Sequence, residues 1–152
     1  MTEKLIYISE PLTGRSDIEE IKVFCRKVAG VCVGLGLKPY LPFEATDPIA
    51  NPDVTPAQVF ETDKRLTQAA AGAVFVIPQG SPQSLGVGME MVFATTARVP
   101  AIVVIDQSEQ LDGFVEGMIQ ENEDLKLWHR VFMRGLNDGR IIESIESMLR
   151  RM

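Results

Sequence analysis

The chain has 152 residues, a mass of 16.8 kDa and a formal net charge of −6. A chain of this length suits one domain, residues 1–152, built around a single hydrophobic core. Its acidic balance argues against nucleic-acid or anionic-membrane surfaces, which need clustered lysine and arginine. We therefore expect a small-molecule ligand, and neither nucleic acid nor membrane as a partner.

The sequence predicts neither a membrane span nor a disulfide. Its longest apolar run, residues 69–78, is about half the ~20 residues that cross a bilayer. The N-terminus lacks the basic-then-apolar pattern of a signal peptide, so we expect a cytoplasmic protein. Cys25 and Cys32 lie too far apart along an expected helix to bridge, and they match no zinc-ligand spacing. We expect both to be small core residues.

Strand-like and helix-like patterns alternate along the chain. Apolar runs predict strands at residues 4–9, 38–41, 73–77, 101–106 and 127–133. Amphipathic stretches predict helices at residues 16–36, 55–70, 85–98, 111–121 and 137–149. Residues 16–19 have the form of a capping box, residues 55–56 that of a helix start, and Asn137 that of a helix cap. The proline-rich residues 42–54 predict a long loop, a common place for binding.

This alternation predicts an α/β fold. We expect a flavodoxin- or Rossmann-like open sheet of five mostly parallel strands, with helices on both faces. The runs at residues 73–77 and 101–106 are continuously apolar, as in strands covered on both sides. Ligands of such sheets bind beyond the carboxyl ends of the strands, so Tyr7 and residues 78–90 should lie at the same edge.

A glycine-bearing helix start follows the third expected strand. Gly86 and Gly88 each cost a helix about 1 kcal/mol relative to alanine, and a usual reason is that a ligand approaches bare backbone. Glu90 lies just inside that turn, where the helix dipole favours an ionised carboxylate. Glu90 is therefore a candidate nucleophile, although a helical glutamate is by default a solvated surface residue.

Several familiar sites are excluded. The glycines follow the third strand, and Met91 stands where a dinucleotide fingerprint needs its third glycine. No phosphate-binding GxxxxGK[ST] loop is present. His129 is the only histidine, and beside Trp128 on an expected strand it is interpreted as packing. Asp63 on a helix and Tyr7 in a strand are weak signals when each is taken alone.

Together, these residues resemble a known family. The sequence GAVFVIP of residues 72–78, with SLGVGME of residues 84–90, resembles the nucleoside 2-deoxyribosyltransferases and the related nucleoside 5'-monophosphate N-glycosidases. The opening IYISEPL of residues 6–12 looks like the first strand and loop of that family. The spacing from Asp63 to Glu90 also fits, and the likeness covers most of residues 4–121.

The resemblance implies a two-step reaction. Glu90 attacks C1' of the sugar and forms a glycosyl-enzyme, which a second base or water resolves with net retention. Tyr7 holds Glu90 by a hydrogen bond. Asp63 contacts the nucleobase and supplies or shares the proton that the departing ring nitrogen needs. No metal or organic cofactor is implied.

The substrate's 5' end separates the two activities. Transferases commonly place an aspartate six residues before the nucleophile, where this chain has Ser84, whose hydroxyl favours a 5'-monophosphate. The first loop has Pro11 and Thr13 where monophosphate enzymes tend to carry serine and arginine, with Arg15 two residues on. Glu116 resembles a position that reaches the neighbouring subunit's site, where it would repel a phosphate or accept a 5'-hydroxyl.

Base selection is open in the sequence. Transferases tend to sandwich the base with aromatic residues after the first strand, where this chain offers Leu12 and Thr13. Phe43 can stack on a base, and its alternative is a core position. Because of Glu116 we favour base exchange on 2'-deoxynucleosides. A 5'-monophosphate N-glycosidase and a non-catalytic nucleotide-binding module are the alternatives, and a homodimer or larger homo-oligomer is expected.

Overall fold

The computed structural model describes residues 3–12, 14–46, 50–80 and 85–152. All strand pairs of the five-stranded sheet are parallel, in the order β2-β1-β3-β4-β5. The strands are β1 (Leu5–Ser9), β2 (Lys38–Tyr40), β3 (Gly72–Ile77), β4 (Ala101–Asp106) and β5 (Trp128–Met133). The expected fold class is thereby confirmed, and the strand order is that of flavodoxin-like sheets.

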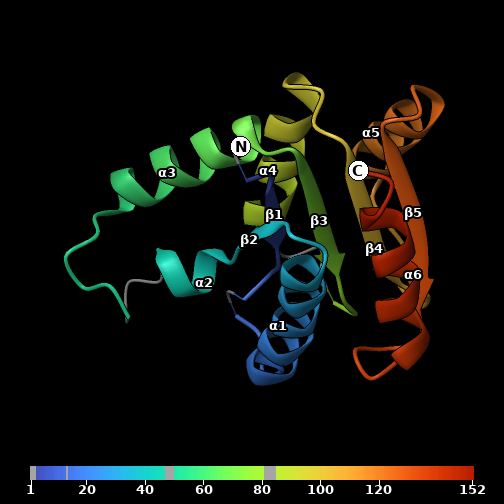
Figure 1. Cartoon of the computed structure of the whole chain (residues 1–152), viewed down its shortest axis with the longest axis horizontal. Helices are drawn as coiled ribbons and strands as arrows, with labels where there is room; N and C mark the ends of the chain where they lie inside the picture. Colours follow the sequence, from blue (N-terminus) through green and yellow to red (C-terminus); the bar gives the residue numbers. More distant parts are fainter. Residues whose placement is uncertain (1–2, 13, 47–49, 81–84) are drawn as a thin grey trace.

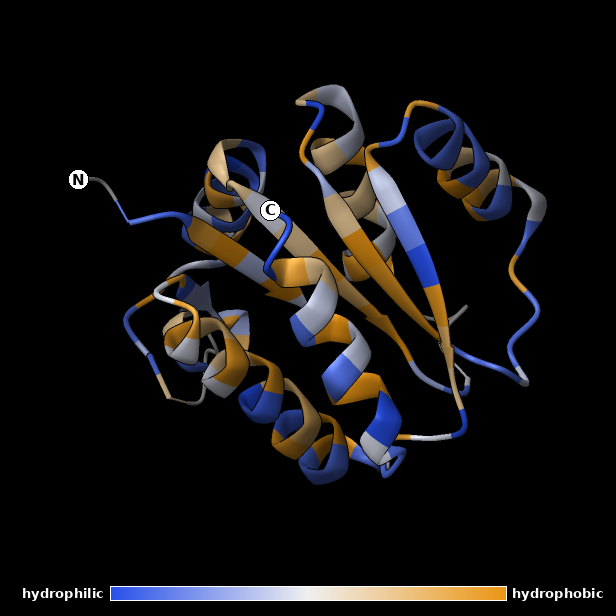
Figure 2. Cartoon of the chain, turned by 45° about the vertical axis from the view of Figure 1, so that its right-hand side comes forward, coloured by the Kyte–Doolittle hydropathy of each residue, from blue (hydrophilic) through white to orange (hydrophobic). Residues whose placement is uncertain are grey.

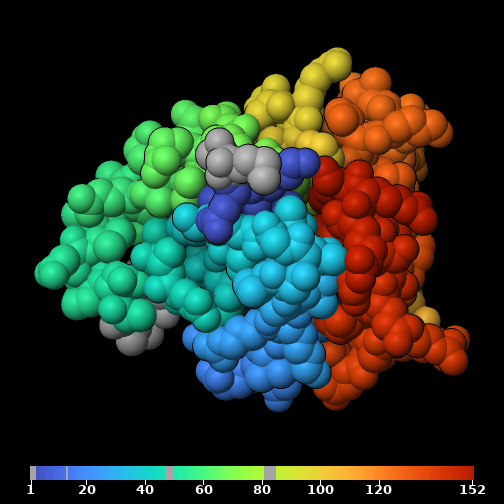
Figure 3. All heavy atoms as spheres, in the orientation of Figure 1, coloured from blue at the N-terminus to red at the C-terminus, as the bar shows by residue number. Residues whose placement is uncertain are grey.

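Helices cover both faces of the sheet (Figure 1). They are α1 (Ile18–Gly34), α2 (Pro42–Ala45), α3 (Pro56–Ala69), α4 (Leu85–Thr96), α5 (Gly113–Asp124) and α6 (Gly139–Leu149). On one face α1 and α6 pack side by side, as the space-filling view also shows (Figure 3). On the other face α4 and α5 cover the sheet, and α3 packs against α4. No helix in the described ranges is both long and apolar enough to span a bilayer.

Alternation along the strands divides the core into two halves. Ile6 and Ile8 of β1 point to the α1 and α6 side, whereas Tyr7 points to the α4 and α5 side. Every residue of β3 and β4 is buried, as their continuous apolar runs predict, and the strands form the hydrophobic centre of the molecule (Figure 2). Cys25 and Cys32 are buried free thiols.

Helix starts depart from the sequence expectation in three places. Asp17, not Ser16, is the N-cap of α1 and makes no side-chain cap bond, because Arg15 holds its carboxylate. Asp138, not Asn137, caps α6 and accepts from the backbone N–H of Arg140. The expected loop at residues 42–54 opens with the short helix α2, since a proline at the first position is compatible with a helix start.

The start of α3 is as expected. Thr55 is its N-cap, and Thr55 and Gln58 form a reciprocal capping box. The strand order reverses between β1 and β3, because the chain runs outward from β1 to β2 and then returns to β3 on the other side. The carboxyl ends of these two strands therefore define the crevice where ligands of open α/β sheets bind.

Candidate active site

Glu90 projects from the second turn of α4 into this crevice. Its Oε2 is buried and has no hydrogen-bond partner among the described residues. Burial raises the pKa of Glu90 to about 7, and the charge of Asp63 adds to the rise. The hydroxyls of Ser9 and Tyr7 act in the opposite direction. The helix dipole expected to favour the anion is outweighed, because its effect is confined to the first turn whereas desolvation acts on the whole carboxyl group.

Two hydroxyl groups of β1 face Glu90. Tyr7 Oη and Ser9 Oγ are buried, and within the described part of the chain neither makes a hydrogen bond of normal geometry. Both nevertheless lower the pKa of Glu90, so they lie near its carboxyl group. Residues two apart on a strand share a face, which places both hydroxyls on the α4 side of the sheet. Tyr7 therefore lies near Glu90, but the expected hydrogen bond between them is not formed with normal geometry.

Asp63 on α3 is held from the other side of the crevice. Its Oδ1 accepts a hydrogen bond from Tyr40 Oη at 3.2 Å and one from Thr46 Oγ1 at 3.5 Å. Burial raises the pKa of Asp63, and these two bonds oppose the rise. The charge of Asp63 contributes to the raised pKa of both Glu90 and Tyr7. The three residues to which the resemblance assigns catalysis, Tyr7, Asp63 and Glu90, therefore form one electrostatic unit.

Tyr7 and Tyr40 connect the two halves of this unit. They are paired in the β1–β2 register, and their rings stack with centroids 5.3 Å apart. Burial raises the pKa of Tyr7, with the charges of Glu90 and Asp63 adding to the effect. Tyr7 therefore stays a neutral hydroxyl in the physiological range and is available as a hydrogen-bond donor.

Glu10 adds a third carboxyl group to the crevice. It follows β1 directly, and its Oε2 is buried without a hydrogen-bond partner among the described residues. Burial and then the charge of Glu90 raise its pKa well above the ordinary value. Sequence inspection missed Ser9, Glu10 and Tyr40. Ser9 could have been found because it is two residues from Tyr7 and so shares its face of β1. Glu10 could have been found because it directly follows the carboxyl end of β1, where ligands of such sheets bind.

Arg15 lies beside the loop that precedes α4. It donates two hydrogen bonds to Asp17, at 2.8 and 2.9 Å, and one to the carbonyl of Gln79. The next residue, Gly80, donates its backbone N–H to Glu109. Arg15 thus places a cation in direct contact with this loop, and its charge is already matched by Asp17.

Gly86 and Gly88 lie in the first turn of α4 with open space around them. A Cβ atom added at either position would meet no atom within 4 Å outside its own helix surroundings. Packing against the described residues therefore gives no reason for glycine at these positions. Their role in admitting a ligand to the backbone stays a prediction.

The other predicted substrate-binding residues have different outcomes. Ser84 and Thr13 lie outside the described residues. Leu12 packs against the α1 and α6 half of the core. Phe43 is only 6% exposed in the same half, with the cationic ends of Lys22 and Arg26 over its ring at 5.5 and 5.3 Å. Phe43 is a core residue, and its buried ring is not open for stacking on a base.

Glu116 lies on α5, where its own chain already pairs it. Its carboxylate accepts two hydrogen bonds from Arg130 Nη1, at 2.9 and 2.8 Å, and one from Gln120. These contacts lower the pKa of Glu116. Arg130 also binds Glu123 at 2.8 Å, so one cation serves two carboxylates. The role of Glu116 in a neighbouring subunit stays a prediction.

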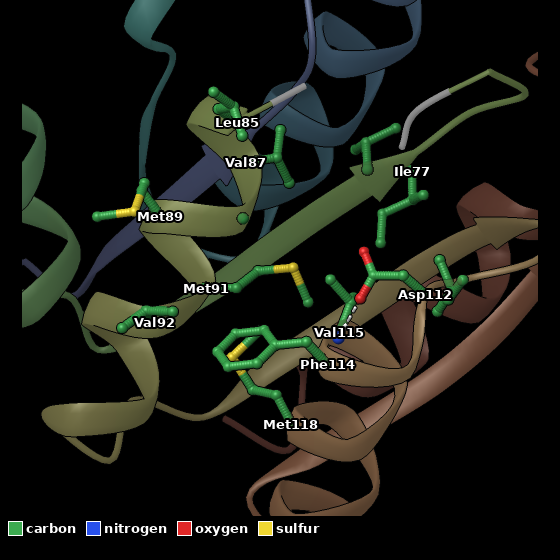
Figure 4. Close-up of a pocket in the computed structure, with 13 residues that line it drawn as sticks. Ile77, Leu85, Val87, Met89, Met91, Val92, Asp112, Phe114, Val115 and Met118 are labelled. Atoms are coloured by element: carbon green, nitrogen blue, oxygen red, sulfur yellow. Dashed lines mark hydrogen bonds between the residues drawn. The ribbon is translucent and has the colours of Figure 1, made fainter. Parts of the chain in front are cut away.

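An apolar pocket of about 340 Å³ lies between α4 and α5, apart from the carboxyl cluster. Met91, Phe114 and Met118 point toward one another in it, and Asp112 caps α5 beside them (Figure 4). It is lined by none of the three predicted catalytic residues. The crevice around Glu90 is the better candidate site, because buried polar groups without partners converge there. His129 is exposed on β5, so the interpretation of this residue as packing is wrong, because its side chain lies exposed on the edge strand of the sheet.

The comparisons with known proteins identify structural neighbours only. No protein-family model matches the sequence, and no curated protein matches it. The CMP N-glycosidase BcmB of Clostridium botulinum superposes with a TM-score of 0.70 at 11% identity, over 95% of this chain and 99% of that chain. A 2-deoxyribosyltransferase of Bacillus psychrosaccharolyticus superposes with a TM-score of 0.61 at 16% identity, over 91% and 95%.

A flavodoxin-like domain from Synechococcus gives a TM-score of 0.52 at 13% identity, over 97% of this chain and 94% of that chain. These likenesses establish the fold. The expected resemblance to the nucleoside 2-deoxyribosyltransferases and their N-glycosidase relatives is thereby confirmed for the fold. The superpositions cover between 94% and 99% of each of these three neighbours, so the likeness is not confined to the sheet.

Proposed function

We propose that the protein cleaves the N-glycosidic bond of a nucleoside or nucleotide through Glu90. The observation that carries this proposal is the convergence of Glu90, Asp63 and Tyr7 at the carboxyl ends of β1 and β3. A nucleophile needs a carboxylate that is available but not tied by hydrogen bonds, and Oε2 of Glu90 has no such bond among the described residues. The structural neighbours BcmB and the deoxyribosyltransferase support the same class of reaction.

In the first step, the Glu90 carboxylate attacks C1' of the sugar. The bond from C1' to the base nitrogen breaks, and its electron pair leaves with the base, which needs a proton. The transition state carries positive charge on the sugar ring, and a nearby carboxylate stabilises that charge. Tyr7 and Ser9 offer hydroxyls to the attacking carboxyl group and to the ester that it becomes.

In the second step, an acceptor attacks C1' and releases Glu90. We favour a second nucleobase as acceptor. We favour a 2'-deoxynucleoside over a monophosphate as substrate, because carboxyl groups dominate the crevice around Glu90. Glu10, Asp63 and Glu90 contribute three carboxyl groups, and Arg15 is already paired with Asp17. A phosphate dianion would be repelled by the charges of Asp63 and of ionised Glu90, whereas the raised pKa of Glu10 keeps that group neutral. The resemblance assigns the proton for the departing base to Asp63.

A second candidate is hydrolysis of a 5'-monophosphate. The position of Arg15 favours it, because Arg15 reaches the Gln79 carbonyl in the segment that precedes α4. An incoming phosphate that displaced Asp17 from Arg15 would gain both a guanidinium and the N–H groups of a helix start. Ser84 supports the same alternative, because a serine hydroxyl can donate a hydrogen bond to a phosphate.

A homodimer is part of the proposal. Leu85, Met89 and Phe114 are 84%, 50% and 75% exposed around the pocket between α4 and α5. A second copy covering this surface would remove large apolar side chains from water and bring the α5 segment of one chain toward α4 of the other. Light scattering of the wild type and of Phe114→Asp tests this: the variant should be a monomer if the surface is the interface.

Product analysis tests the proposed reaction. The protein is incubated with 2'-deoxynucleosides and, separately, with their 5'-monophosphates, each with and without a second free base, and the products are separated by chromatography. Formation of a new nucleoside supports the transferase. Free sugar phosphate released at equal rates with and without added base supports the hydrolase instead. No turnover of any substrate contradicts both and leaves a nucleotide-binding module.

A further inference from the structure

Glu10 is a buried carboxyl group that the reaction above does not use. It stands directly after β1, at the switch point of the sheet. The backbone N–H of Phe43 lies near its carboxyl group and lowers its pKa, whereas Oε2 is buried and has no partner among the described residues. A buried oxygen of this kind is unfavourable when it is left without a hydrogen-bond partner. It therefore points to a ligand or a proton that completes it.

The groups facing Glu10 come from four elements. Lys22 and Cys25 lie on α1, Asp63 on α3 and Glu90 on α4, besides the Phe43 N–H on α2. Burial raises the pKa of Glu10 most, and the charges of Glu90 and Asp63 raise it further, while Lys22 and Phe43 oppose the rise. Burial and the nearby Glu10 also raise the pKa of the Cys25 thiol, which stays neutral.

Asp63 is differently placed. Its Oδ1 already accepts from two hydroxyls, Tyr40 and Thr46, and such bonds favour the charged form. Of these carboxyl groups, Asp63 is suited to remain an anion and an acceptor. Glu10 receives no side-chain hydrogen bond from the described residues and is suited to hold a proton. When two carboxyl groups of one site have environments that favour different protonation states, one can act as the acid and the other as the acceptor.

Resting on the proposed glycosyl transfer, we propose that Glu10 is the proton carrier of the reaction, giving a proton to the departing base and taking one from the incoming acceptor. In the first half, the bond from C1' to the base breaks, the electron pair goes to the base nitrogen, and the Glu10 proton joins it there. In the second half, the acceptor's N–H proton passes to the Glu10 carboxylate while its nitrogen bonds to C1'.

The charge of Glu90 determines when Glu10 holds its proton and when it releases it. While Glu90 is an anion, its field holds the proton on Glu10. When Glu90 becomes a neutral glycosyl ester, that field disappears and Glu10 releases its proton more readily, at the moment the base needs it. When the acceptor frees Glu90, the field returns and Glu10 takes up a proton again. No co-reactant beyond the two bases is required.

Leaving-group dependence tests the role. Glu10→Gln keeps the shape of the side chain but carries no exchangeable acid. With an ordinary purine 2'-deoxynucleoside, kcat should fall about 10²–10⁴-fold, the usual contribution of a general acid. With an N7-methylated purine 2'-deoxynucleoside, whose cationic base leaves without protonation, kcat for base release should fall less than about 10-fold. Glu44→Gln, an exposed glutamate on α2, is the matched control and should leave both rates unchanged.

The outcomes separate this role from the proposed function. Equal losses on both substrates, or no loss on either, overturn the role of Glu10 while the reaction stands. A wild type that turns over neither substrate overturns the proposed function and this role with it. If Glu10→Gln does not fold, carbon-13 titration of the carboxyl groups in the wild type and in Glu90→Gln decides. The midpoint of Glu10 should fall by about one pH unit or more when the charge of Glu90 is removed, and an unchanged midpoint overturns the proposal.

Discussion

Tyr40 donates a hydrogen bond to Asp63 across the crevice, at 3.2 Å from its hydroxyl to Oδ1. The two residues are 23 positions apart in the sequence, one on β2 and the other on α3. The ring of Tyr40 also stacks on Tyr7, so a single side chain links the candidate base-contacting carboxylate to the residue that faces the nucleophile. Together with Thr46, Tyr40 thereby holds Asp63 in place and favours its charged form against the effect of burial.

Replacing Tyr40 with phenylalanine isolates the hydrogen bond. Tyr40→Phe keeps the stacked ring but removes the donor, so the pKa of Asp63 should rise further, because this bond lowers it. A bond to a charged group contributes about 1.5–3 kcal/mol, and we expect a loss of unfolding free energy near the lower value at pH 8. Carboxyl NMR titration and urea unfolding check both effects. An Asp63 that titrates as in the wild type would contradict the assignment.

The two glycines of α4 give a test in which stability and activity move in opposite directions. Gly86→Ala meets open space, so it should stabilise the fold by up to about 1 kcal/mol. If a ligand approaches the backbone here, the same change should lower kcat/KM. Gly30→Ala on α1 is the control, since its surroundings are equally open. It should give the stability gain with unchanged kinetics, and equal kinetics in the two variants would count against a ligand at Gly86.

Much of this arrangement was predictable from local patterns. The sheet, the order of the elements and the start of α3 follow from strand runs, periodicity and the Thr55 cap. The place of Tyr40 in the site, which sequence inspection missed, is set by contacts between distant segments. Tyr40 enters only because the parallel register of β1 and β2 places it beside Tyr7, and a short strand carries no sign of its register.

Competition between neighbouring side chains explains other differences. Ser16 fits the capping pattern, but the chain enters α1 at Asp17, whose carboxylate pairs with Arg15 and is lost as a cap. Phe43 follows a proline in an expected loop, yet α2 turns its ring into the core. Glu116 is typical of a solvated helix face, and only the fold shows that Arg130 on β5 pairs with it.

The raised pKa of Glu90 predicts a pH-dependent gain in stability for Glu90→Gln. The folded state holds the Glu90 proton up to about 7, whereas the ordinary value is 4.5. Between these values the unfolded chain binds fewer protons, so the wild type loses stability as pH rises, and glutamine does not. The unfolding free energy of Glu90→Gln relative to wild type should increase by about 2–3 kcal/mol from pH 4 to pH 8. Denaturant unfolding at both pH values measures it, and a constant difference would refute the buried, unpaired carboxyl group.

Glu116 and Glu123 form a matched pair for testing the contribution of a neighbouring subunit. Both bind Arg130 at 2.8 Å, so Glu116→Gln and Glu123→Gln each remove one partner of the same cation. If Glu116 accepts a 5'-hydroxyl in the neighbouring site, only its variant should raise KM for a nucleoside, by about 10-fold for a hydrogen bond to a charged group. Steady-state kinetics on both variants decide, and equal KM values would remove Glu116 from the site.

The covalent intermediate on Glu90 tests the central claim most directly. The protein is mixed with a 2'-deoxynucleoside without acceptor base, quenched in acid within milliseconds to seconds, and analysed by intact and peptide mass spectrometry. The account predicts an added mass of one deoxyribosyl group on the peptide that contains Glu90, absent in Glu90→Gln and lost when a second base is added before quenching. Turnover without any adduct, or an adduct on another residue that Glu90→Gln retains, would contradict Glu90 as the nucleophile.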